Sequence, residues 1–189
     1  MTAEQVVRTV TAGQAVRTPT VGQAVRTVTA EQVVRTVTDP ELPMVTLAEL
    51  GIVREVRQDG AGVTVTITPT YSGCPAMESI RADISAALRT AGFGPVEVRT
   101  VLAPAWTTDW ISESGRRKLS EAGIAPPGAA PHRADGPIPL TLTPRPSTLR
   151  CPRCGSAQTE AIAAFGATAC RELRRCLECR EPFEHMKEI

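Results

Sequence analysis

The stretch GIVREVRQDGAGVTVTITPTYSGCPAMESIRADISAALRTAGFGPVEVRTVL, residues 51–102, carries the pattern that decides the fold. Residues 51–58 and 62–70 are rich in Val, Ile and Thr, and an Asp59-Gly60 turn lies between them, which predicts two connected strands. The second run alternates apolar residues with threonines, as expected for a strand with one buried face.

The residues that follow, 75–91, have helical spacing, and Gly92 is expected to end this helix. A third strand is predicted over 95–102 and a further helix over 107–122, with a short helix over 32–38 before the first strand. The order predicts an α/β (α+β) domain with a small three-stranded sheet and flanking helices. The apolar face of the long helix is formed by Met77, Ile80, Ile84, Ala87 and Leu88.

Composition divides the chain into four parts. Residues 1–30 repeat a nine-residue unit, AEQVVRTVT and its variants, whose odd period gives no continuous apolar face in a helix or a strand, so we expect a disordered extension. Residues 31–124 form the α/β domain. Residues 125–148 hold seven of the sixteen prolines and are expected to be an extended linker. Residues 149–189 form a cysteine-rich module.

Charge and hydropathy exclude several classes of function. The net charge is +1 without a dense basic stripe, so we do not expect nucleic-acid binding. No stretch approaches the roughly 18 apolar residues that cross a bilayer, and no secretory signal is seen, so we expect a cytoplasmic protein without membrane contact. In a reducing cytoplasm, close cysteine pairs indicate metal chemistry and not disulfides.

The strongest motif is a pair of C-x2-C sequences, CPRC and CLEC, separated by twenty-one residues. Two such turns supply four thiolates in a tetrahedron, which Zn²⁺ favours, although the same thiolates could hold iron or an iron–sulfur cluster. We predict a structural zinc ribbon that could hardly fold without its metal. Its ligands would be Cys151, Cys154, Cys176 and Cys179.

Cys74 stands apart from the other cysteines, directly before Pro75. Proline favours the first position of a helix, so Cys74 is predicted at the N-cap, where the helix dipole favours a thiolate. It could be a nucleophile, a metal or cluster ligand, or a small buried residue. Because neither His132 nor His185 lies in a catalytic motif, no catalytic residue is assigned. We expect His185 at the surface and Cys170 as a small buried residue.

Five segments together resemble one protein family: DPELP, LGIVREV, TPTYSGCPAMESI, AGFGPVEVRTVLAPAWTTDWISESGRRKLSEAGIAPP, and CPRCGS with FGATACRELRRCLECREPFEHMK. The resemblance covers residues 32–187 and is to PaaD, also called PaaJ, a component of the phenylacetyl-CoA epoxidase (ring 1,2-epoxidase) system of aerobic phenylacetate degradation. Within it, Trp106 and Trp110 lie four residues apart and are expected to share one face, as a core anchor or a docking patch.

The α/β portion is also similar to the iron–sulfur assembly factors that include SufT. This resemblance implies that Asp39, Glu41 and Cys74 occupy the characteristic positions, with Thr70 nearby. It implies an accessory role, not catalysis by the chain alone, in supplying a transient iron–sulfur cluster to a client. The clients implied are the epoxidase reductase, with its plant-type cluster, and the di-iron oxygenase subunits; iron–sulfur assembly proteins are further partners.

Three alternatives compete with this maturation role. The chain could be a structural subunit of the epoxidase complex, a thiol-dependent oxidoreductase that uses Cys74, or a zinc-ribbon protein that binds nucleic acid. The lack of a resolving cysteine near Cys74 counts against the oxidoreductase, and the near-neutral charge counts against nucleic acid. The structural subunit is the main alternative.

Overall fold

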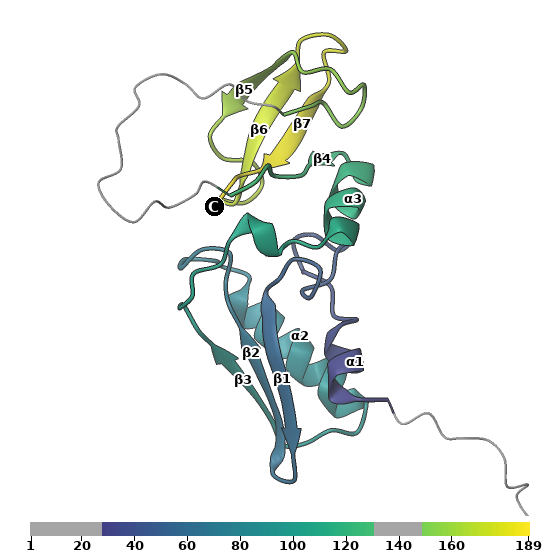
Figure 1. Cartoon of the computed structure of the whole chain (residues 1–189), viewed down its shortest axis with the longest axis vertical. Coiled ribbons are helices and arrows are strands. Elements are labelled where there is room, and N and C mark those ends of the chain that lie inside the picture. The colour runs from purple at the N-terminus through teal and green to yellow at the C-terminus, as the bar shows by residue number, and fades with distance from the viewer. Residues whose placement is uncertain (1–27, 131–148) are drawn as a thin grey trace, which may run out of the picture.

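A computed structural model describes residues 28–130 and 149–189 (Figure 1). The nonapeptide repeats before residue 28 and most of the predicted linker lie outside the described residues. The elements, in chain order, are α1 (Ala30–Val34), β1 (Val53–Asp59), β2 (Gly62–Ile67), α2 (Met77–Thr90), β3 (Val96–Thr100), the 3-10 helix η1 (Thr108–Trp110), α3 (Glu113–Glu121), β4 (Ile124–Ala125), β5 (Thr159–Ala163), β6 (Arg171–Cys176) and β7 (Pro182–Met186).

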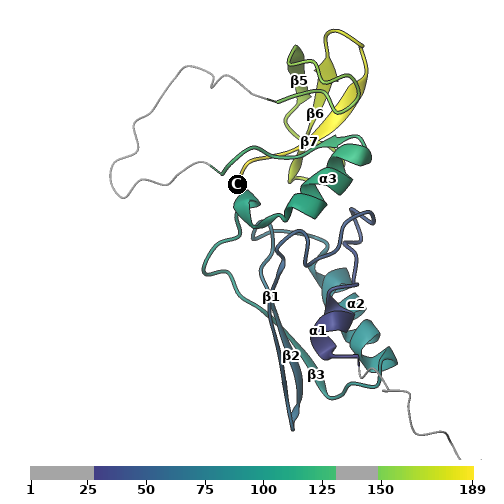
Figure 2. The same cartoon turned by 45° about the vertical axis from the view of Figure 1, so that its right-hand side comes forward.

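The first sheet has the strand order β1-β2-β3. Strands β1 and β2 form an antiparallel hairpin, whereas β3 runs parallel to β2 because α2 carries the chain back across one face of the sheet. Figures 1 and 2 show α1 and α2 on the same face. Every second residue of β2, namely Val63, Val65 and Ile67, is buried on that face. This mixed α+β architecture confirms the predicted fold class.

Helix α2 buries the face that its spacing predicts. Ile80, Ile84 and Leu88 are fully buried, and Gly92 follows the helix with φ of +89°, a conformation that suits glycine. The helix begins at Met77 and not at residue 75.

The short helix α1 likewise begins earlier than predicted. Thr29 caps it, and the Thr29 hydroxyl and the Gln32 side chain each accept a hydrogen bond from the other residue's backbone N–H. The helix spans Ala30–Val34 and not 32–38.

The single helix predicted over 107–122 is wrong, because two capping residues divide it. The Thr107 hydroxyl accepts a hydrogen bond from the Asp109 N–H at the start of η1. Ile111 is then extended, with ψ of 122°, and the Ser112 hydroxyl caps α3 by accepting from the Gly115 N–H at 3.0 Å. The chain therefore turns between η1 and α3, which brings both against the C-terminal module (Figure 2).

The C-terminal module is a four-stranded sheet in the order β4-β7-β6-β5. Strand β4 comes from the segment after α3 and pairs in parallel with β7, so the two modules share a sheet edge. Met186 of β7 and Ile124 of β4 are buried in the same apolar cluster as the core of the first module. The Thr108 N–H also donates to the Ile189 carbonyl oxygen at 3.1 Å. The two modules therefore pack as one body.

Within residues 28–130 and 149–189, none of the helices combines the length and the apolar character that crossing a membrane requires.

Candidate functional site

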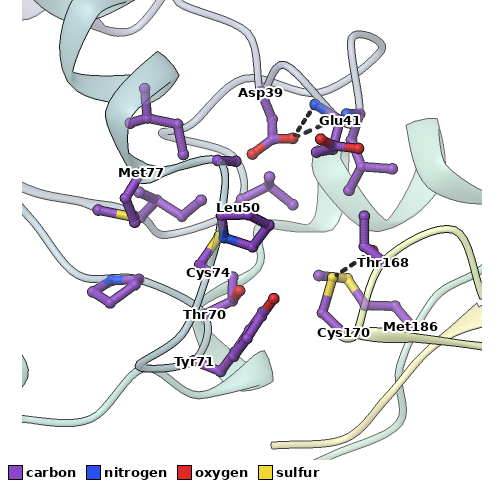
Figure 3. Close-up of a pocket in the computed structure, with 16 residues that line it drawn as sticks. Asp39, Glu41, Leu50, Thr70, Tyr71, Cys74, Met77, Thr168, Cys170 and Met186 are labelled. Atoms are coloured by element: carbon purple, nitrogen blue, oxygen red, sulfur yellow. Dashed lines mark hydrogen bonds between the residues drawn. The ribbon is translucent and has the colours of Figure 1, made fainter. Parts of the chain in front are cut away.

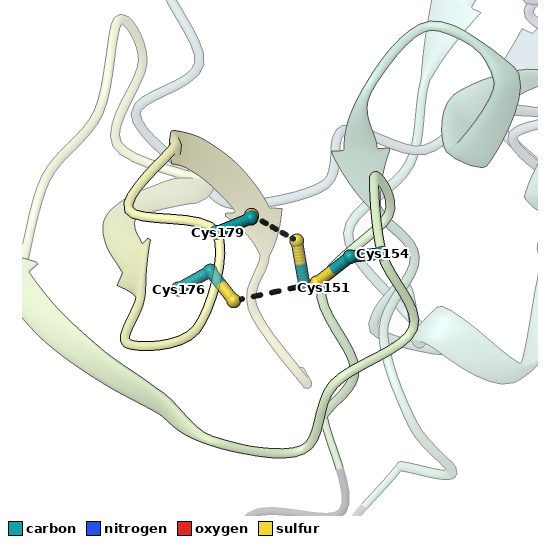
Figure 4. A group of neighbouring side chains, drawn as sticks. All are labelled: Cys151, Cys154, Cys176 and Cys179. Atoms are coloured by element: carbon teal, nitrogen blue, oxygen red, sulfur yellow. Dashed lines mark hydrogen bonds between the residues drawn. The ribbon is translucent and has the colours of Figure 1, made fainter.

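The four cysteines of the C-x2-C pairs converge on one point (Figure 4). Their sulfur atoms all lie within 4.8 Å of one another, and none of them forms a disulfide. The Cys151 and Cys179 sulfurs are 3.8 Å apart, and the Cys154 and Cys176 sulfurs are 3.5 Å apart. A tetrahedral ion with Zn–S bonds of about 2.3 Å requires sulfur separations of about 3.8 Å. The four residues therefore fit one thiolate-bound metal ion.

Two tight turns hold these sulfurs in place. In the first turn, the Gly155 N–H donates to the Cys151 carbonyl oxygen at 2.9 Å, and Gly155 has φ of +74°. In the second, the backbone N–H of Cys179 donates to the Cys176 sulfur and lowers the pKa of this thiol to about 7. The Ser156 N–H acts in the same direction on Cys154, but the neighbouring sulfurs raise the pKa of Cys154 to about 12. A cation would relieve this competition among the four thiolates.

A second site is a pocket of about 490 Å³, including space open to solvent, between the first module and the ribbon (Figure 3). The four residues predicted there from the sequence, Asp39, Glu41, Thr70 and Cys74, all line it. They come from two separate segments, the loop after α1 and the loop between β2 and α2. Among the residues that the structure describes around this pocket, none is a lysine or an arginine.

Asp39 is fixed on the pocket wall by its own loop. Its Oδ1 atom accepts hydrogen bonds from the backbone N–H groups of Glu41 at 2.8 Å and Leu42 at 2.9 Å. Within the described part of the chain, Oδ2 of Asp39 has no hydrogen-bond partner. Burial raises the pKa of Asp39, and the two backbone hydrogen bonds counteract this only in part. The second carboxylate oxygen is thus free to bind a ligand.

The structure corrects the expected charge state of Cys74. The N-cap of α2 is Ala76, so Cys74 lies two residues before the position where the helix dipole would act on it most strongly. Burial raises the pKa of the Cys74 thiol; a hydrogen bond from the Ala76 N–H opposes this, whereas the charges of Cys170, Asp39 and Glu41 raise it further. The direction of this shift favours the thiol over the thiolate, opposite to what the predicted N-cap position implied, and a bound cation would have to displace the thiol proton.

The ribbon contributes pocket residues that sequence reasoning missed. Thr168, Cys170 and Met186 line the pocket opposite the loops of the first module. Cys170, expected as a small buried residue, is half-buried and lies directly before β6. No spacing motif links it to Cys74, because the two residues meet only through the packing of the modules.

His185 was expected at the surface, and this expectation is wrong. Its side chain is 6% exposed, and Nδ1 lies 2.9 Å from Oε1 of Glu172 on the neighbouring strand. Glu172 also pairs with Arg174 at 2.7 Å. Because β6 and β7 pair in register, these side chains lie side by side in the sheet and form part of the ribbon structure.

Two family models match the chain. The model described as the PaaD zinc beta ribbon domain matches residues 136–187, and the model described as an iron–sulfur cluster assembly protein matches residues 27–101. Over 151 residues the chain is 48% identical to a putative 1,2-phenylacetyl-CoA epoxidase subunit of Escherichia coli. This match covers 80% of the chain and 86% of the relative. The chain belongs to the PaaD family.

Other proteins match a part of this PaaD-family chain. It is 34% identical over 83 residues to an Fe-S protein maturation auxiliary factor of Porphyromonas gingivalis, covering 43% of the chain and 78% of the relative. A solved structure, a domain of unknown function (DUF59) from Bacillus anthracis, is 30% identical with a TM-score of 0.45, covering 48% of the chain and 87% of that domain. The family resemblance seen in the sequence is confirmed, and the zinc-ribbon match together with the clustered cysteines indicates a metal-binding module.

Proposed function

We propose that this protein is an accessory component of the phenylacetyl-CoA ring 1,2-epoxidase system that assists the assembly or insertion of iron–sulfur clusters. In this proposal the pocket holds iron–sulfur cargo transiently at Cys74, and the cargo passes to the reductase or to the oxygenase subunits. The four-cysteine site holds a structural Zn²⁺, and the protein works in the cytoplasm with the other epoxidase components.

The observation that carries the proposal is the chemistry of the pocket wall. A half-buried thiol, Cys74, faces the same space as the carboxylates of Asp39 and Glu41, and no lysine or arginine lines the described pocket. The anionic forms of these groups repel one another, and the one guanidinium that acts on Asp39, that of Arg171, lies outside the described pocket wall and is paired with Glu184, so the wall favours a cationic ligand. Iron in clusters is bound chiefly by thiolates, and carboxylate oxygen is a further donor.

The openness of the pocket supports cargo over a resident cofactor. The ribbon site has four thiolates and is closed, as structural zinc sites are. Cys74 belongs to no group of three or more candidate ligands within 4.8 Å among the described residues. A cluster bound there would keep positions open for the thiolates of a client. Incomplete coordination is what transfer from one protein to another requires.

The match of residues 27–101 to the iron–sulfur cluster assembly model supports the same proposal. These residues contain Asp39, Glu41, Thr70 and Cys74, whereas the ribbon match lies outside them. The relative from Porphyromonas gingivalis, whose name describes maturation of Fe-S proteins, also matches about this length of chain. The ribbon lies outside the part that matches the iron–sulfur cluster assembly model, and in this proposal it provides a structural or docking module.

The test uses cells that make the epoxidase system with either the wild-type chain or the Cys74→Ser variant. Iron and sulfide per reductase, and its electron-transfer activity, should fall severalfold with Cys74→Ser. Ser72→Ala is the matched control, because Ser72 is exposed in the same loop, and it should leave both unchanged. Normal cluster content with Cys74→Ser, together with stoichiometric co-purification of the chain with the oxygenase, would instead establish a structural subunit.

A further inference from the structure

Two thiols from different modules face the same pocket. Cys74 lies in the loop before α2, and Cys170 lies in the ribbon directly before β6. Both line the pocket, and Figure 3 shows them on opposite sides of it, with Asp39 and Glu41 along one edge. Both are half-buried free thiols, so neither is used in a disulfide or in the four-cysteine site. The pocket therefore has a second sulfur that the first module does not supply.

A half-buried threonine and a buried arginine support the Cys170 sulfur. The Thr168 hydroxyl lies 3.0 Å from this sulfur, and it accepts a hydrogen bond of 2.9 Å from Nε of Arg171. Because a guanidinium can only donate, the proton of the Thr168 hydroxyl is available to the sulfur. Arg171 is 5% exposed and is itself paired with Glu184 at 2.5 Å. The Cys170 sulfur can thus accept a hydrogen bond from the Thr168 hydroxyl.

The two thiols also act on one another electrostatically. The pKa of Tyr71 is raised by burial and then by the anionic forms of Cys74, Cys170 and Glu41. These three groups therefore lie within electrostatic range of the same hydroxyl. The wall of the same pocket also carries Tyr71, Asp39 and Glu41. Two cations lie near Cys170: Arg171, which donates to Thr168 and is paired with Glu184, and Lys187, whose Nζ donates to the Ala169 carbonyl oxygen. A thiophilic cation between the two sulfurs would displace the thiol protons, and the thiolates formed would balance its charge.

We propose that Cys170 is a second thiol ligand, together with Cys74, for the iron–sulfur cargo of this pocket. This inference rests on the proposed function and deepens it, because it makes the ribbon a direct part of the cargo site. On binding, each thiol releases its proton to solvent and forms one Fe–S bond, and no electron transfer is involved. The remaining cluster positions stay open toward the pocket mouth for a client.

The experiment uses the full chain with its zinc, treated anaerobically with Fe³⁺ and sulfide as the probe, so that an all-ferric [2Fe–2S] cluster can form without an added oxidant. Three quantities are measured: iron and sulfide per chain, the visible charge-transfer absorbance, and the alkylation of each cysteine by iodoacetamide, read by mass spectrometry. In the wild type, loading should protect Cys74 and Cys170 together. Cys170→Ser should weaken cluster retention by at least about tenfold and expose Cys74 to alkylation, since even a group that only orients a ligand contributes this much. Ala169→Ser is the matched control, because it introduces a serine at an exposed position next to Cys170. It should retain the cluster as the wild type does.

The outcomes separate this inference from the proposed function. If Cys74→Ser abolishes loading while Cys170→Ser retains it with Cys74 protected, the composite site is wrong and the Cys74 site stands. If the wild type takes up no cluster, or if Cys74 and Cys170 form a disulfide with each other instead, neither cargo binding at Cys74 nor the role of Cys170 as a second ligand stands. Zinc per chain, measured in every variant, shows whether the ribbon is still folded. A Cys170→Ser protein with normal zinc and lost cluster protection supports the proposal.

Discussion

The indole Nε1–H of Trp106 donates a hydrogen bond of 2.9 Å to the carbonyl oxygen of Leu50. Trp106 is 4% exposed and lies after β3, whereas Leu50 lies before β1 and lines the pocket. This bond joins the segment that leads to the ribbon to the wall of the pocket. Trp106 is therefore the core anchor among the two tryptophans.

The bond predicts a specific loss of stability. Trp106→Phe keeps most of the apolar surface but leaves the buried Leu50 carbonyl without its donor, which should cost about 1–3 kcal/mol in the free energy of unfolding. Trp110→Phe should cost less, because Trp110 is only half-buried and stacks against the Arg54 guanidinium. Urea titration followed by circular dichroism measures both. Equal losses in the two variants would contradict the anchor role of Trp106.

Gly51 predicts a second, backbone effect. It has φ of +70°, and a Cβ atom there would lie 2.6 Å from Cβ of Trp110. Gly51→Ala should therefore destabilise the protein by about 2–4 kcal/mol, through strain and overpacking. Gly60 in the β1–β2 turn is the matched control, since a Cβ atom added there would meet nothing within 4 Å, and Gly60→Ala should change stability by less than about 0.5 kcal/mol. Similar melting temperatures for the two variants would refute the close packing at Gly51.

Glu49 predicts how stability depends on pH. Burial alone would raise its pKa, but hydrogen bonds from Lys118, Thr46 and Ser114 outweigh this and lower the pKa to about 2, from an ordinary value of 4.5. A lowered pKa in the folded state stabilises the protein above about pH 4.5, and this stabilisation is lost as the pH falls toward 2. Because the Lys118 side chain is 38% exposed, solvent screening reduces the effect to about 1 kcal/mol.

The measurement compares Glu49→Gln with the wild type across pH. The variant should be less stable by about 1 kcal/mol at pH 7, and the difference should shrink toward pH 2–3. Glu55→Gln removes a carboxylate from an exposed pair with Arg57 and should have little effect at any pH. A stability difference for Glu49→Gln that does not change with pH would show that its charge is not responsible.

Metal removal is predicted to unfold the ribbon. Among the described residues, its own buried cluster consists of Ala125, Cys151, Cys176 and Phe183, with Leu149 partly buried against it, and two of the four are proposed metal ligands. So small an apolar core cannot offset the entropy of ordering three strands. A strong chelator, or Cys176→Ser, should therefore abolish amide protection in β5–β7 while the sheet β1–β3 stays folded. Hydrogen exchange measures this directly. A protected ribbon free of metal would contradict the structural role of the ion.

Much of the fold followed from local patterns. The alternation in residues 62–67 and the helical spacing that buries Ile80, Ile84 and Leu88 depend only on neighbours in the chain, and the structure confirms both. Helix ends were less predictable, because Thr107 and Ser112 can each cap a helix and only tertiary packing decides that both do. The strand β4 was missed, since two residues carry no periodic signal and pair only when β7 is nearby.

The candidate sites also contain residues that local sequence patterns predict and residues that only tertiary packing brings together. The four ribbon cysteines were predictable because their spacing itself builds the turns that bring them together. The resemblance to assembly factors indicated Cys74, Asp39 and Glu41, which the structure brings to one pocket. Cys170 could not be connected with them, because it reaches the pocket through the docking of the ribbon. The raised pKa of Cys74 depends chiefly on burial, which no sequence pattern near it indicates.

Cluster transfer in purified components tests the central claim most directly. The wild-type chain, loaded anaerobically with Fe³⁺ and sulfide, is mixed with cluster-free epoxidase reductase, and the visible absorbance and electron-transfer activity of the reductase are followed over time. We predict that the loaded chain restores both faster than the same Fe³⁺ and sulfide free in solution, and that Cys74→Ser removes the advantage. Restoration at the same rate with the wild type, with Cys74→Ser and with free iron and sulfide would contradict a maturation role.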